Sequence, residues 1–166
     1  MFRRLLIGGI LLMAATGSAS ASDIVLTPPM PIDGLATEVT AAIKLGKVAL
    51  PSIELSACEE PFWYKCHYQL GHAVKIVVSG PERSRPATGI WTIVSDDRDI
   101  RTYILLVDFF MTRFDEFSID QRANLIESAA ADFEAGRKEV KIEGERAIVT
   151  LERRNASELW ITVVGR

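Results

Sequence analysis

The spacing of apolar residues predicts three helices in this chain. Apolar side chains recur at helical intervals over residues 34–45, directly after Asp33, a residue type that caps helix N-termini. The same spacing recurs over residues 100–117, where a β-prone run also fits a strand, and we favour the helix. Ser118 and Gln121 form a capping-box pattern that opens a third helix.

Alternation of apolar and polar residues predicts the strands between and after these helices. The predicted strand segments span residues 52–57, 67–78, 89–94, 139–142, 147–153 and 158–164. Within residues 67–78 the apolar side chains share one parity, which places them on one face of a sheet. The resulting order, α-βββ-αα-βββ, predicts an α+β fold with helices on one face of a largely antiparallel sheet.

The N-terminal segment, residues 1–21, has the three parts of a secretory signal peptide. Arg3 and Arg4 supply the positive start, residues 5–15 the apolar stretch, and residues 19–21 the small side chains before the cut. The apolar stretch is shorter than the roughly 20 residues that span a bilayer as a helix. We therefore expect cleavage after residue 21, by either the general secretory or the twin-arginine route.

The chain is expected to have three parts. The signal peptide is followed by a proline-rich lead-in, residues 22–33, and by a single globular domain, residues 34–166. Asp108 and Arg113 interrupt the longest later apolar run, so no membrane span is expected after signal cleavage. The expected location of the mature protein is the periplasm or the medium outside the cell.

The charge balance argues against nucleic acid as a partner. The whole chain has 19 Lys and Arg against 22 Asp and Glu, and removal of Arg3 and Arg4 with the signal leaves 17 − 22 = −5. Nucleic-acid binding relies on clustered cations that neutralise phosphates. A mildly acidic mature protein is therefore expected to bind neither nucleic acid nor an anionic membrane surface.

The two cysteines of the chain, Cys58 and Cys66, are expected to form a disulfide, because an exported protein leaves the reducing cytosol. If the two residues face each other across paired strands, the apolar positions of the strands fall out of phase. We therefore predict either a β-bulge that corrects the phase, for example at Gly71, or a bridge that lies inside the loop.

The loop that the cysteines enclose carries three consecutive aromatic residues, Phe62, Trp63 and Tyr64. Aromatic side chains lose little conformational entropy on binding and supply much contact area, so a tied loop of this kind is a candidate partner-binding site. The alternative is that the aromatic side chains fold back onto the sheet and close an edge of the core.

Metal and enzyme chemistry depend on His67 and His72, the two histidines of the chain. Together with Cys58 and Cys66 they have the composition of a zinc site, although their spacing fits no familiar pattern and a disulfide would remove two ligands. The sequence contains no nucleophile elbow and no phosphate-binding glycine loop. We expect no catalytic residue, metal or cofactor, and keep a metal-binding protein or enzyme using the histidines as an alternative.

The segment from Tyr103 to Phe114 is apolar around most of its circumference. A helix of this kind is usually buried, so we expect the central helix of the core. In a domain this small, part of the helix could instead be covered by a second subunit. Self-association through this segment is the alternative.

Residues 34–95 have a helix followed by strands that bear a spaced cysteine pair, Cys58 and Cys66. In this outline the chain resembles exported members of the YbjN-like group, which are related in fold to secretion chaperones. The predicted terminal strands depart from that group, whose pattern ends in a helix. The resemblance therefore transfers no residue roles.

These features favour a non-catalytic exported protein that binds another periplasmic or envelope protein. It would act as an accessory, chaperone-like or inhibitor module, with the aromatic loop between Cys58 and Cys66 as its contact site. A carrier of a small apolar ligand, held between sheet and helices, is a further alternative. Such a carrier would require a large interior cavity.

Overall fold

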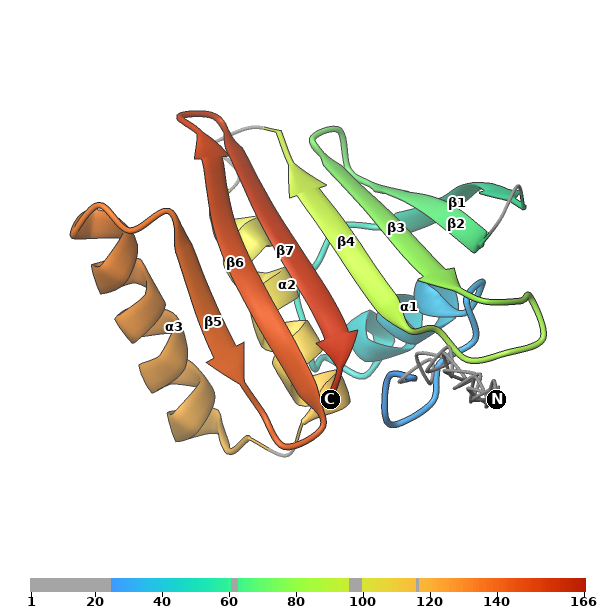
Figure 1. Cartoon of the computed structure of the whole chain (residues 1–166), viewed down its shortest axis with the longest axis horizontal. Helices are drawn as coiled ribbons and strands as arrows, with labels where there is room; N and C mark the ends of the chain where they lie inside the picture. Colours follow the sequence, from blue (N-terminus) through green and yellow to red (C-terminus); the bar gives the residue numbers. More distant parts are fainter. Residues whose placement is uncertain (1–24, 61–62, 96–99, 116) are drawn as a thin grey trace, which may run out of the picture.

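The computed structural model describes residues 25–60, 63–95, 100–115 and 117–166. This part of the chain forms a seven-stranded antiparallel sheet with three helices on one of its faces (Figure 1). The predicted α+β class is confirmed. The predicted signal peptide, residues 1–21, lies outside the described residues.

The sheet is built from two antiparallel groups of strands that meet at β4 and β7. The strands are β1 (Ile53–Glu59), β2 (Tyr64–Leu70), β3 (Val74–Gly80), β4 (Gly89–Val94), β5 (Glu139–Glu143), β6 (Ala147–Asn155) and β7 (Glu158–Gly165). Their order across the sheet is β1-β2-β3-β4-β7-β6-β5. The helices are α1 (Leu35–Lys44), α2 (Ile100–Phe114) and α3 (Ile119–Glu134).

The predicted strand segment 67–78 is two strands, β2 and β3, so the first group has four members. Gly71 makes the turn between them with a φ of 59°, a left-handed conformation that glycine adopts without strain. The turn preserves the parity of the apolar residues, because Tyr68 pairs with Ile76 and Leu70 with Val74. All four side chains are buried on the face that the helices cover.

Local signals explain two of the three helices. Residues 100–114 are helical, as favoured over the strand, and α3 begins with the predicted capping box between Ser118 and Gln121. The cap of α1 differs from the prediction, because Gly34 is the N-cap residue and no side chain caps the helix. Asp33 instead lies near Arg83, with 3.9 Å between carboxylate and guanidinium.

The core lies between the sheet and α2. Most of α2 is buried, including Leu106, Phe110 and Phe114, so it is the central helix that the sequence predicts. Within the segment from Tyr103 to Phe114, Ile104 is the large apolar side chain that stays exposed, at 40%. Self-association through this segment would therefore have little apolar surface to use.

The proline-rich lead-in packs into the core. Leu26, Met30 and Ile32 are fully buried, and backbone hydrogen bonds join Leu26 and Met30 to Ala87. Arg113, on α2, also contacts this segment through its guanidinium. The guanidinium pairs with Glu38 of α1 and donates hydrogen bonds to the carbonyls of Pro28 and Pro29.

None of the described helices is both long enough and apolar enough to cross a membrane. The longest, α3, has 16 residues and is mostly exposed.

Candidate functional site

Cys58 and Cys66 form the predicted disulfide between β1 and β2. The two residues are direct partners in the strand register, with 2.06 Å between the sulfurs and 4.1 Å between the Cα atoms. The bridge therefore lies on the ladder itself. It ties the edge strand of the sheet to its only described neighbour, close to the tip of the hairpin.

A β-bulge in β1 resolves the conflict of phase that the sequence raises. The register shifts between Leu55 and Ala57, so Ser56 is the extra residue of β1. The predicted bulge is thus present, but at Ser56 rather than at Gly71, which makes the turn into β3. Before the bulge, Ile53 faces the core. After the bulge, Cys58 faces Cys66.

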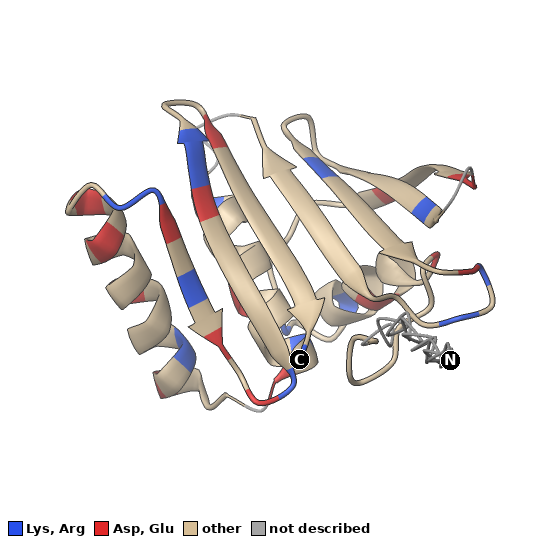
Figure 2. Ribbon diagram, in the orientation of Figure 1, with Lys and Arg blue, Asp and Glu red and all other residues tan. Residues whose placement is uncertain are grey.

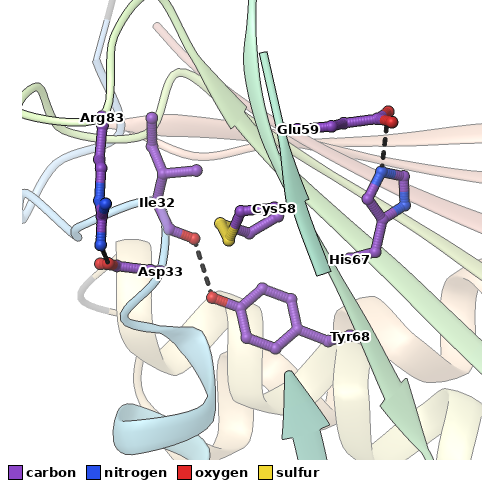
Figure 3. The surroundings of a disulfide bond; sticks show 8 residues. Ile32, Asp33, Cys58, Glu59, His67, Tyr68 and Arg83 are labelled. Atoms are coloured by element: carbon purple, nitrogen blue, oxygen red, sulfur yellow. Dashed lines mark hydrogen bonds and ion pairs between the residues drawn. A yellow bond between two sulfur atoms is a disulfide. The ribbon is translucent and has the colours of Figure 1, made fainter. Parts of the chain in front are cut away.

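The two sides of the hairpin have different environments (Figure 3). The disulfide lies on the same side as Tyr68, whose hydroxyl donates to the carbonyl of Ile32 at 2.8 Å. Burial raises the pKa of Tyr68 to about 12. On the opposite side, His67 lies 3.0 Å from the carboxylate of Glu59, its diagonal neighbour across the hairpin.

The structure separates the three aromatic residues of the loop. Tyr64 opens β2 and is 8% exposed, so its ring closes the edge of the core. Trp63, directly before it, is 41% exposed. Phe62 lies outside the described residues. Of the predicted contact residues, Trp63 is therefore the one whose side chain is seen to reach solvent.

β1 is the more exposed edge of the sheet. Ile53 is buried, whereas the other six residues of the strand are exposed, with Leu55 at 46%. The opposite edge strand, β5, is flanked by α3 (Figure 1). Among the strands that the structure describes, β1 has one hydrogen-bonded neighbour, so its outer edge retains unpaired backbone groups.

Acidic residues surround this edge. β1 carries Glu54 and Glu59, and Glu60 follows directly. Glu60 also lines a shallow hollow beside the hairpin with Asp33, Glu82, Arg83 and Ser84. The described surface at this edge therefore combines the exposed apolar side chain of Leu55 with negative charge.

The histidines do not gather into a metal or catalytic site. His67 is on the outer face of β2, whereas His72 is exposed in the turn after it. Both cysteine sulfurs are held in the disulfide. Within residues 25–60, 63–95, 100–115 and 117–166, no group of three His, Cys, Asp or Glu side chains is placed to hold a metal ion.

Two clefts bear on the hypothesis of an apolar ligand. The first, of 480 Å³, lies between α1 and α2 and is lined partly by the charged pair Glu38 and Arg113. The second, of 230 Å³, lies between α2, α3 and β6, where Leu151 forms part of its wall. The second has the predicted place, between sheet and helices, but it is smaller than the roughly 300–1,000 Å³ typical of ligand pockets.

Leu55 and the exposed edge of β1 were missed at the sequence level. In the alternating pattern Leu55 looks like a core residue, because its neighbours in sequence are polar. It is 46% exposed although its register partner on β2, Tyr68, is buried. A short strand with Glu54 near its start and Glu59 and Glu60 at its end is a signal for an edge that could have been used.

No protein family, curated protein or solved structure matches this chain. The resemblance to the YbjN-like group therefore remains a similarity in the order of elements, and β7 at the C-terminus departs from it as predicted.

Proposed function

We propose that this chain is an exported, non-catalytic accessory protein that binds another envelope protein through the disulfide-tied hairpin. The hairpin is defined as β1, β2 and the loop between them. The observation that carries the proposal is the exposure of Trp63 and Leu55 on a strand pair that a covalent bond holds in place. Chaperone-like and inhibitor roles are both compatible with such a site.

The disulfide supports binding because it limits the conformational freedom of the loop between β1 and β2. A partner then loses less free energy in ordering that loop. A partner that orders a flexible loop loses roughly 0.5–1.5 kcal/mol for each immobilised side chain that is rich in rotamers. Cys66 is fully buried, and its bond to Cys58 ties β1 to β2 on the side of the sheet where Tyr68 lies. The exposed aromatic side chain is therefore presented from a fixed backbone.

The edge of β1 supports a particular mode of binding. A segment of the partner can add to the sheet as an eighth strand, with main-chain hydrogen bonds to β1 and apolar contacts to Leu55 and Trp63. The acidic residues Glu54 and Glu59 then select a segment that carries lysine or arginine. The same charges keep the edge from pairing with neutral strands.

Site-specific photo-crosslinking in the cell tests the proposal. A photo-reactive phenylalanine analogue is placed at position 55 or 63, and at position 119 as the control. Ile119 is 75% exposed on α3, so its side chain is at least as accessible. We expect a discrete adduct with one envelope protein from positions 55 and 63 and none from position 119.

A second experiment distinguishes an energetically important contact from chance proximity to the photo-reactive group. With the photo-reactive group at position 55, Trp63→Ala should reduce the adduct about tenfold or more, as truncation of a binding hot spot does. Ile119→Ala should leave the adduct unchanged. No adduct at positions 55 and 63, or an equal adduct at position 119, would contradict the proposal.

A further inference from the structure

The face of the sheet that the helices leave open has an ordered arrangement of side chains. The strand register aligns its outward residues in three rows that run from β2 to β5. The rows are Gln69-Lys75-Ile93-Trp160-Glu152-Glu139, His67-Val77-Trp91-Thr162-Thr150-Lys141 and Lys65-Ser79-Gly89-Val164-Ile148-Glu143. This set of residues is called the open sheet face below.

The centre of the open sheet face is apolar. The partly exposed apolar side chains are Val77, Trp91, Ile93, Ile148, Trp160 and Val164. Figure 2 shows that the central strands β4 and β7 carry almost no charge, whereas β2, β3, β5 and β6 carry charged residues on both sides of them. Two partly exposed tryptophans lie in this centre, and the guanidinium of Arg154 covers the ring of Trp160 at 4.6 Å from its centroid. An apolar centre with tryptophans and a charged rim is the composition of a protein interface.

The charges of the rim differ between the two sides. In the rows, β2 and β3 contribute Lys65 and Lys75, whereas β5 and β6 contribute three glutamates and one lysine, Glu139, Glu143, Glu152 and Lys141. The glutamates also have neighbours within the chain. The pairs are Lys141–Glu139 at 3.4 Å, Arg154–Glu152 at 3.0 Å and Arg166–Glu143 at 3.8 Å. These pairs are largely exposed and therefore weak, so the carboxylates can be shared with a partner.

The position of these charges selects one way to stack two copies face to face. A two-fold axis parallel to the strands, between β4 and β7, keeps each row opposite itself and exchanges its two ends. Lys75 then lies opposite Glu152 of the second copy, and Lys65 lies opposite Glu143. Ile93 lies opposite Trp160 at the centre.

An axis perpendicular to the strands gives the opposite result. It would leave each strand opposite its own copy and exchange the outer rows, which places Glu139 opposite Glu143 and Lys141 opposite its own copy. Like charges placed together in this way disfavour the arrangement. The one unfavourable neighbour in the parallel arrangement is Lys141, which would lie opposite His67.

The area of the open sheet face agrees with a small dimer interface. Six strands about 4.8 Å apart and three rows about 6.8 Å apart cover roughly 600 Å² on each copy. Stable interfaces bury about 600–1,000 Å² on each partner, so this face reaches the lower end of that range.

We infer that the open sheet face binds a second copy of this chain, with the two sheets stacked about a two-fold axis parallel to their strands. β2 of the disulfide-tied hairpin forms one end of this interface and β1 lies outside it, so the dimer leaves the outer edge of β1 accessible. The dimer is independent of the proposed binding of an envelope protein.

The oligomeric state of charge-exchange variants, measured by sedimentation of the mature oxidised protein, tests both the dimer and its orientation. The wild-type chain should be dimeric at tens of micromolar. Lys75→Glu should weaken the dimer about tenfold, because two symmetric contacts become repulsive. The double variant Lys75→Glu, Glu152→Lys should restore the dimer, which also excludes misfolding as the cause of the loss.

Lys44→Glu is the matched control, because it makes the same change of charge at an exposed position of α1, in the helix layer. It should leave the dimer intact. A wild-type chain that stays monomeric would leave the open sheet face for a different partner and overturn the inference. A dimer that is insensitive to Lys75→Glu, or a double variant that stays monomeric, would also overturn it.

Discussion

At the scale of single residues, the hydroxyl groups buried in the core differ in whether they form a hydrogen bond. The hydroxyl of Tyr68 donates to Ile32, and that of Tyr103 donates to the carbonyl of Trp160 at 3.3 Å. Thr92 differs from them, because its side chain is fully buried and its hydroxyl has no hydrogen-bond partner among the residues that the structure describes. A buried hydroxyl without a partner destabilises the fold.

Thr92→Val should therefore stabilise the protein. Valine has nearly the same shape, and the neighbours across the ladder, Ile76 and Ile161, are apolar. We expect the free energy of unfolding in urea to rise by about 1 kcal/mol. Thr88→Val is the control with the opposite expectation, because the Thr88 hydroxyl donates to the carbonyl of Ser79 at 3.3 Å. A loss of stability in Thr92→Val would mean that the hydroxyl has a partner after all.

At the scale of elements, the hairpin shows how a local irregularity and a covalent bond act together. Without the bulge at Ser56, the disulfide and the buried Ile53 would require opposite phases of β1. With the bulge, one strand satisfies both. The exposed residues of β1 then contribute little to the core, so the disulfide is a main tie between this edge and the rest of the sheet.

Loss of the disulfide should affect the hairpin more than the rest of the sheet. For Cys58→Ser with Cys66→Ser, the chain-entropy estimate gives a loss of roughly 2.5 kcal/mol in the free energy of unfolding. Hydrogen exchange should accelerate most in β1, and less in β4 and β7, which lie at the centre of the sheet. Uniform acceleration across all strands would contradict a local role for the bridge.

Several elements could be predicted from the sequence because their signals are local. The capping box fixes the start of α3, and helical spacing identifies α2 despite its β-prone residues. The position of the bulge could not be predicted, since it depends on which residues of two strands meet. For the same reason, the sequence could not distinguish the buried Tyr64 from the exposed Trp63 beside it.

At the scale of the whole molecule, the lead-in and α2 join parts of the chain that lie far apart in sequence. Residues 28 and 29 meet Arg113, and Ile32 meets Tyr68. The burial of Leu26, Met30 and Ile32 was not predicted, because prolines between them hide any periodic pattern. Long-range contacts of this kind are the part of the fold that local patterns do not contain.

The buried tyrosines predict a loss of stability at alkaline pH. Burial raises the pKa of Tyr68 to about 12 and also raises that of Tyr103, while both titrate near 10 in the unfolded chain. Their contribution is fully present below pH 10, and it is lost as pH rises from about 10 to 12, because the unfolded chain releases its protons first. Urea unfolding across this range should give falling stability.

Tyr68→Phe isolates the contribution of one group. The variant should lose stability less steeply than the wild type between about pH 10 and 12, although it starts lower because the hydrogen bond to Ile32 is gone. Identical slopes in the two proteins would show that Tyr68 titrates normally in the folded state.

The proposed function rests on an exported chain whose hairpin is closed by the Cys58–Cys66 bond. The intact mass of the protein recovered from the cell envelope, with and without reductant, tests this premise most directly. The account predicts a chain that begins at Ser22 and is lighter by two hydrogen atoms than its reduced form. A chain with both thiols free, and above all one that carries a metal ion, would contradict the account and direct attention to the cysteines and His67 as ligands.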